Sequence, residues 1–150
     1  MIVVYFDGLC EPKNPGGVAT YGFVATQDGK KIYEGRGLAC KPYDPAATNN
    51  VAEYTGVVKA LEWLVDQGRT KEPVIVRGDS QLVINQATGA WKVKSPSIAS
   101  LNARVRELFF KFSSLTFEWV PREQNREADA LTNLAYAEFR ASLDRSGKGP

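Results

Sequence analysis

The sequence contains no histidine, and this absence excludes whole classes of chemistry. Without imidazole there is no Ser-His triad, no histidine general base and no zinc site of the common histidine type. The chain also lacks any apolar run of the 18 or more residues that a membrane span needs, and its start shows no charged region followed by a cleavage site. We therefore expect a cytoplasmic protein with no membrane partner.

The sequence also has few cysteines and a small net charge. The only two cysteines, Cys10 and Cys40, fall at the same ends of the first and third expected strands, which would separate them by two strand spacings, about 9.5 Å. That separation exceeds disulfide reach, so we expect free thiols without a catalytic role. The net charge of +2, with 24% charged and 43% hydrophobic residues, is typical of a soluble globular protein and does not by itself indicate a nucleic-acid partner.

The length of 150 residues suits a single domain, which we place at 1–141, followed by a polar, glycine-rich flexible tail at 142–150. The short turn at Asp28-Gly29 predicts a hairpin, Thr48-Asn49-Asn50 is good N-cap chemistry, and Asn125 caps a final helix. Periodicity predicts strands at 1–7, 18–26 and 31–39, a helix over 51–65 stopped near 68, a strand at 73–76, a short helix from 82 into 89, a long helix over 98–112, a strand at 115–120 and a helix after 125. This order, βββαβααβα, predicts an α/β fold with one mixed five-stranded sheet and helices on both faces.

Four acidic residues stand where an expected strand ends or a helix begins: Asp7, Glu53, Asp79 and Asp129. Asp7 directly follows the apolar run at 2–6, and burying even a neutral polar group there without compensation costs roughly 2 kcal/mol or more. If the strands that end at Asp7 and Asp79 are neighbours, their carboxylates repel each other. A hard divalent cation such as Mg²⁺, which prefers oxygen ligands, would compensate both effects.

Each of these acids except Asp7 also has a plain structural explanation. Glu53 could complete a capping box with Asn50, and Asp79 could cap the short helix. Asp129 lies near the start of the last helix, where the positive end of the helix dipole stabilises an acid. Taken singly, the cap is the better interpretation of Glu53 and Asp79. Taken together, four chain segments that each bring one carboxylate to one sheet edge favour a metal site.

Four blocks of the sequence resemble the signature of the type 1 ribonuclease H family. They are 5–8 with 14–16, then 48–53, 78–83 and 120–129, in the order and with the element string of that family. The resemblance implies cleavage of the RNA strand of an RNA/DNA hybrid with two Mg²⁺ or Mn²⁺ ions. It places the catalytic, metal-binding acids at Asp7, Glu53, Asp79 and Asp129, with Asp7 bridging both ions.

The resemblance also implies a set of substrate contacts. Amides that donate and accept hydrogen bonds suit the 2′-hydroxyl of RNA, Thr48 matches a position that seats a DNA-strand phosphate, and two further residues would contribute backbone contacts. The amide positions are Asn14, Asn49, Asn50 and Gln81, and the backbone contacts are those of Cys10 and Ser80.

The sequence departs from the family pattern at two places. The connection from 89 to 97 is too short for the basic protrusion that many members carry, so substrate affinity should be weaker or carried by Trp91, Lys92 and Lys94; these residues could equally be an ordinary solvated face. The loop before Asp129 has no histidine, and Arg122 and Glu123 are the candidates to replace it. Both departures resemble the archaeal-like branch, in which some members also cleave double-stranded RNA.

Two other functional classes compete with a hybrid-cleaving nuclease that acts as a monomer. A non-catalytic hybrid-binding module predicts loss of one or more of the acids, and none is lost. A polynucleotidyl transferase or resolvase would keep the acids but not the set of Asn and Gln residues, which is present.

Overall fold

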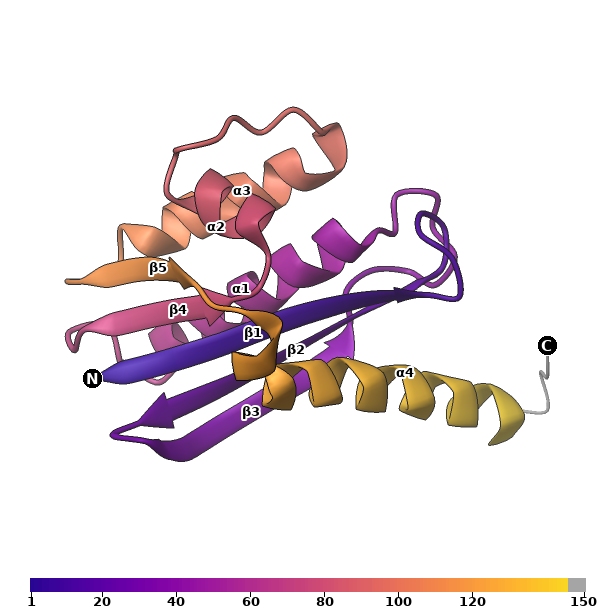
Figure 1. The fold of residues 1–150 in the computed structure, drawn as a ribbon, viewed down its shortest axis with the longest axis horizontal. Coiled ribbons are helices and arrows are strands. Elements are labelled where there is room, and N and C mark those ends of the chain that lie inside the picture. The colour runs from indigo at the N-terminus through magenta and orange to yellow at the C-terminus, as the bar shows by residue number, and fades with distance from the viewer. Residues whose placement is uncertain (146–150) are drawn as a thin grey trace.

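In the computed structural model, which describes residues 1–145, a five-stranded sheet lies between helices (Figure 1). In sequence order the elements are β1 (Ile2–Glu11), β2 (Val18–Gln27), β3 (Lys30–Leu38), α1 (Asn49–Asp66), β4 (Val74–Gly78), α2 (Gln81–Ala87), α3 (Pro96–Phe109), β5 (Leu115–Trp119), the 3₁₀ turn η1 (Arg122–Gln124) and α4 (Arg126–Arg145). This is the predicted order, with η1 added before the last helix. No helix in the described part of the chain is both long and apolar enough to cross a membrane.

The sheet has the order β3-β2-β1-β4-β5. The first three strands form an antiparallel meander, and β4 and β5 are parallel to β1. The hairpin between β2 and β3 turns through Asp28 and Gly29, both with positive φ, as the Asp-Gly pair predicted. Helix α1 packs on one face with α3 behind it, and α4 crosses the other face over β2 and β1 (Figure 1).

The main core lies between the sheet and α1. Side chains that alternate along β1, among them Ile2, Val4 and Phe6, are fully buried against Tyr54 and Leu61 of α1. Both cysteines are free thiols, as predicted.

Two predicted boundaries are wrong. β1 does not end at Asp7 but continues to Glu11, because its antiparallel pairing with β2 extends as far as the pair Glu11 and Val18. Its parallel pairing with β4 covers only Ile2–Tyr5, so Asp7 marks the place where β1 and β4 separate and not the end of a strand. The last helix runs to Arg145, so the part of the predicted tail at 142–145 is helical, and 146–150 lie outside the described residues.

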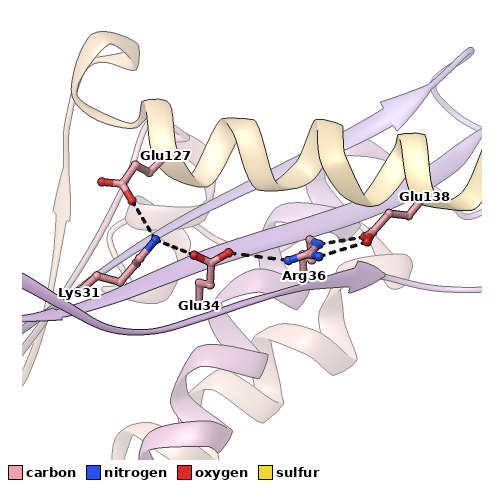
Figure 2. Close-up of polar contacts among 5 residues, drawn as sticks. All are labelled: Lys31, Glu34, Arg36, Glu127 and Glu138. Carbon is pink, nitrogen blue, oxygen red and sulfur yellow. Dashed lines mark hydrogen bonds and ion pairs between the residues drawn. The ribbon is translucent and has the colours of Figure 1, made fainter.

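Helix α4 is fastened to the edge strand β3 by a chain of ion pairs (Figure 2). Lys31 Nζ lies 2.7 Å from Glu34 Oε1 and 3.9 Å from Glu127 Oε2. Arg36 lies 3.7 Å from Glu34 and donates to Glu138 at 2.8 Å. We call these five residues, Lys31, Glu34, Arg36, Glu127 and Glu138, the β3–α4 ion-pair chain.

Candidate active site

The fold brings the predicted acids together at the edge of the sheet where β1 and β4 separate. Asp7 of β1, Glu53 of α1 and Asp79 after β4 each offer a carboxylate oxygen, and these oxygens all lie within 4.8 Å of one another. Asp129, in the first turn of α4, lines the same cavity of about 620 Å³ and is hydrogen-bonded to Asp7. Residues up to 122 positions apart in the chain thus meet at one point.

A glycine allows α1 to reach Asp7. A Cβ atom on Gly8 would lie 2.3 Å from the backbone nitrogen of Glu53, a distance that no side chain tolerates. The helix backbone at Glu53 therefore rests directly against β1, one residue after Asp7. This close approach places the Glu53 carboxylate beside that of Asp7.

The caps of the two helices are supplied by other residues, so the capping interpretations of Glu53 and Asp79 are wrong. Thr48 accepts a hydrogen bond from the Val51 amide at 3.0 Å and caps α1. Ser80 accepts one from the Val83 amide at 3.2 Å and caps α2. Asp129 does lie in the first turn of α4, where the helix dipole favours an acid.

Burial and mutual repulsion make this cluster costly as a set of free anions. Burial raises the pKa of Glu53 to about 8, with further contributions from the charges of Asp7 and Asp79. Burial, then the charge of Asp79, raises the pKa of Asp7 to about 7. The pKa of Asp79 is also raised by burial, and Arg122 and a hydrogen bond from the Asn125 side chain oppose that rise.

The residues present fit a hard divalent cation. The cluster offers only oxygen ligands of negative charge, and two of the three carboxylates are almost fully buried, with Asp7 7% and Glu53 5% exposed. A cation would stabilise the ionised form of every member at once. Mg²⁺ and Mn²⁺ both prefer such carboxylate oxygens, so the chemistry of the donor set favours this class of ion.

The predicted substrate residues divide into two groups. Asn14, Asn49, Ser80 and Cys10 line the cavity of the acids. Asn49 Nδ2 donates to Glu53 Oε1 at 2.8 Å, and the Asn14 side chain accepts from the Asn49 amide at 3.3 Å. The others, Thr48, Asn50 and Gln81, belong to the first turns or caps of α1 and α2 but do not line the cavity.

Trp91 and Lys92 lie apart from the acids. They line a second hollow of about 500 Å³ together with Leu82 and Gln86 of α2. Trp91 is half-exposed, and Lys94 lines the same hollow. The structure does not bring this group into the carboxylate cavity.

Two further residues line the site beside the acids: Trp119, which the sequence did not single out, and Arg122, one of the two candidates to replace a histidine. Trp119, the last residue of β5, donates its indole N–H to the Asp79 carbonyl oxygen at 3.2 Å. Arg122 also lines the cavity, whereas Glu123, the other candidate to replace a histidine, does not. A tryptophan directly before Val-Pro, near the end of an expected strand, was the available sequence signal for Trp119.

The strand order and the carboxylate cluster define a ribonuclease H-like protein. A family model described as reverse transcriptase-like matches residues 17–135. Together with the solved structures that it resembles, this match shows that the chain belongs to the type 1 ribonuclease H family.

Two curated relatives illustrate the similarity. Ribonuclease HI of Halobacterium salinarum is 40% identical over 131 residues, which cover 87% of this chain and 62% of that protein. The bifunctional protein Rv2228c of Mycobacterium tuberculosis is 44% identical over 89 residues, or 59% of this chain and 24% of that protein. The chain thus matches less than two thirds of the length of either relative.

The solved structures match over nearly the whole chain. The crystal structure of RNase H1 from Halobacterium salinarum has a TM-score of 0.80 at 37% identity, covering 91% of this chain and 98% of that one. LC11-RNase H1, solved in complex with an RNA/DNA hybrid, has a TM-score of 0.82 at 32% identity, covering 92% and 98%. The predicted fold class is therefore confirmed.

Proposed function

We propose that this protein is a metal-dependent endoribonuclease that hydrolyses the RNA strand of RNA/DNA hybrids. The observation that carries the proposal is the convergence of Asp7, Glu53 and Asp79 within 4.8 Å, in a cavity that Asp129 completes. The hybrid bound by LC11-RNase H1, a protein of the same family, supports the choice of substrate.

The four acids would hold two ions, Mg²⁺ or Mn²⁺, with Asp7 shared between them. Asp7 suits the shared position because its carboxylate interacts with both Asp79 and Asp129, while Glu53 approaches it from α1. When bound, two such cations activate water and stabilise charge on the attacking and leaving oxygens of a phosphodiester. The protein then needs no nucleophile of its own, which agrees with a sequence that has no histidine.

Recognition of the RNA strand is assigned to the amides around the cavity. Asn14 and Asn49 line it, and each can donate to or accept from a 2′-hydroxyl, the group that distinguishes RNA from DNA. Asn49 also donates to Glu53, so one residue would couple strand recognition to the position of an acid. We assign Asn50 and Gln81 to the rim of the same surface. Cys10 and Ser80 would contact the substrate through their backbone, and Thr48 would bind a phosphate of the DNA strand.

Arg122 is proposed to take the place of the missing histidine. It lines the carboxylate cavity and its charge acts on Asp79. Glu123 does not line that cavity; it lines two other hollows, one of which it shares with Arg122 and Asp129. A guanidinium presents five donors in a fixed fork that matches phosphate oxygens. Arg122 would bind the phosphate group at the cleaved bond through its guanidinium. It would not transfer a proton at neutral pH.

The hollow beside Trp91 and Lys92 is proposed as a second contact for the duplex. Ser80, the N-cap of α2, lines the carboxylate cavity, and Leu82 and Gln86 of the same helix line this hollow. The seven residues of α2 span about 10 Å. A duplex that lies along α2 would therefore meet both places. Trp91 would stack on a sugar or base, and Lys92 would contact the phosphate backbone.

Double-stranded RNA is a second proposed substrate, because the amides that read 2′-hydroxyls in a hybrid find the same groups in an RNA duplex. A monomeric state and a cytoplasmic location remain predictions from the sequence. Sedimentation of the purified protein tests the first, and cell fractionation tests the second.

A cleavage assay with strand-specific labels tests the function. The protein is incubated with RNA/DNA hybrid, double-stranded RNA or DNA duplex, each with Mg²⁺ or with EDTA. We expect cleavage of the hybrid in its RNA strand with Mg²⁺, none with EDTA, and at least a 1000-fold loss in Asp7→Asn. The matched control is Asp66→Asn, the same change at an exposed position on α1, which should cleave normally. Metal-independent cleavage, cleavage of the DNA strand, or full activity in Asp7→Asn would overturn the proposal.

A further inference from the structure

Asn125 is buried at the junction of η1 and α4, only 1% exposed, and it contacts the two segments that carry Asp7 and Asp129. Its backbone nitrogen donates to the Arg122 carbonyl at 3.0 Å, and its backbone oxygen accepts from the Asp129 amide at 3.1 Å. It therefore begins the helical turn on which Asp129 stands.

The side chain of Asn125 reaches across to β1. Its Nδ2 donates to the carbonyl oxygen of Phe6 at 2.9 Å. Phe6 is the residue before Asp7, and it lies one position beyond the stretch in which β1 pairs with β4. Asn125 thus ties down β1 where the neighbouring strand no longer does.

One buried asparagine therefore joins the β1 backbone beside Asp7 to the helix turn that carries Asp129.

The other end of the amide is unsatisfied. Asn125 Oδ1 is buried and has no hydrogen-bond partner among residues 1–145. A buried acceptor without a partner costs about 1–3 kcal/mol, so an asparagine is a poor choice for this position on grounds of stability alone. What an asparagine supplies, and an apolar residue does not, is the pair of donors on Nδ2.

We propose that Asn125 is a positioning residue that holds Asp7 and Asp129 in register for divalent cations. The inference rests on the proposed function of the carboxylate cluster and extends it to a residue that touches neither ion nor substrate. Groups that orient metal ligands in this way typically change metal affinity by about 10–100-fold when they are replaced.

Asn102 provides a matched control in the same chain. It is also a buried asparagine, 7% exposed, whose Nδ2 donates to the Tyr54 hydroxyl at 3.2 Å, but it lies between α3 and α1 in the core. Replacing it removes a buried amide and a hydrogen bond to the Tyr54 side chain of α1, without touching the β1 and α4 segments that Asn125 joins. A loss of stability alone should therefore be common to both asparagines, and a loss of metal affinity should be specific to Asn125.

The test measures Mn²⁺ binding by titration calorimetry in the absence of nucleic acid, together with the Mg²⁺ dependence of hybrid cleavage. We expect Asn125→Ala to bind Mn²⁺ at least 10-fold more weakly, to need correspondingly more Mg²⁺ for half-maximal rate, and to keep the KM for hybrid at saturating Mg²⁺. Asn125→Ser, which retains one donor, should fall between Ala and the parent protein. Asn102→Ala should bind Mn²⁺ like the parent.

The possible results separate the inference from the proposed function. Parent-like Mn²⁺ affinity in Asn125→Ala overturns the inference while the function stands. If the Ala variant does not fold, the Ser variant decides, and parent-like affinity there overturns the inference in the same way. A parent protein that binds no Mn²⁺ and cleaves no hybrid overturns the proposed function, and the inference with it.

Discussion

Replacing Glu53 by glutamine should stabilise the metal-free protein while destroying its activity. Glu53 is 5% exposed, and burial beside Asp7 and Asp79 raises its pKa to about 8. Glutamine has nearly the same shape and keeps an oxygen that can accept the hydrogen bond from Asn49. The substitution therefore removes a buried charge at little cost in packing.

The direction of the pKa shift of Glu53 determines whether its removal stabilises or destabilises the folded protein. An acid with a raised pKa in the folded state favours folding when it is protonated, so its contribution is complete below about pH 4.5 and is lost as the pH rises to about 8. At pH 7.5, three pH units above the ordinary pKa of 4.5, this loss is about 4 kcal/mol at 1.36 kcal/mol per pH unit, because the folded protein still holds a proton that the unfolded chain has released. For a chain of this length that corresponds to about 8–16 °C in Tm.

The assay is thermal unfolding of the parent and Glu53→Gln in EDTA at pH 5 and pH 7.5. The two proteins should unfold at similar temperatures at pH 5, and the variant should be the more stable at pH 7.5. Excess Mg²⁺ should raise the Tm of the parent more than that of the variant. Asp66→Asn, at an exposed site, controls for a general effect of net charge. A variant that is no more stable than the parent at pH 7.5, or a difference that does not change with pH, would refute the reasoning.

Three further predictions follow from other contacts. Arg122→Gln should lower kcat for the hybrid by about 10-fold or more with a smaller change in KM, because it removes a charge-assisted contact to phosphate; steady-state kinetics beside Glu123→Gln, which should behave like the parent, check this. Gly8→Ala should destabilise by more than about 2 kcal/mol in urea unfolding, since its Cβ would meet the α1 backbone at 2.3 Å; a neutral result contradicts the close packing. Arg36→Met should cost only about 1 kcal/mol or less, and that cost should vanish in 1 M NaCl if the exposed β3–α4 ion-pair chain acts by charge.

The sequence was sufficient for the order of the elements and for the meeting of the four acids. The apolar run at the start of β1 and the three-four spacing in α1 are local signals that survive folding, because each reports surface that must be buried. The end of β1 was not predictable in the same way. Its length beyond Asp7 is set by β2, and the sequence of one strand does not reveal how far its partner continues.

The surroundings of the acids were less visible than the acids themselves. Trp119 and Arg122 reach the cavity because β5 and η1 end beside β4, which is a matter of tertiary arrangement. The expected caps at Glu53 and Asp79 failed for a related reason: Thr48 and Ser80 stood at equally suitable positions and took the role. Local pattern could offer these alternatives but could not decide between them.

The β3–α4 ion-pair chain also affects how the molecule behaves beside copies of itself. β3 lies at the edge of the sheet, and an edge strand with free backbone groups is a template for joining other chains into aggregates. Here Lys31 and Arg36 stand along that strand and pair with Glu127 and Glu138 of α4. Glu34 lies on the same strand and pairs with both cations. A second strand that approached this edge would have to bury those charges, so the contacts that hold the helix in place also discourage intermolecular sheet growth.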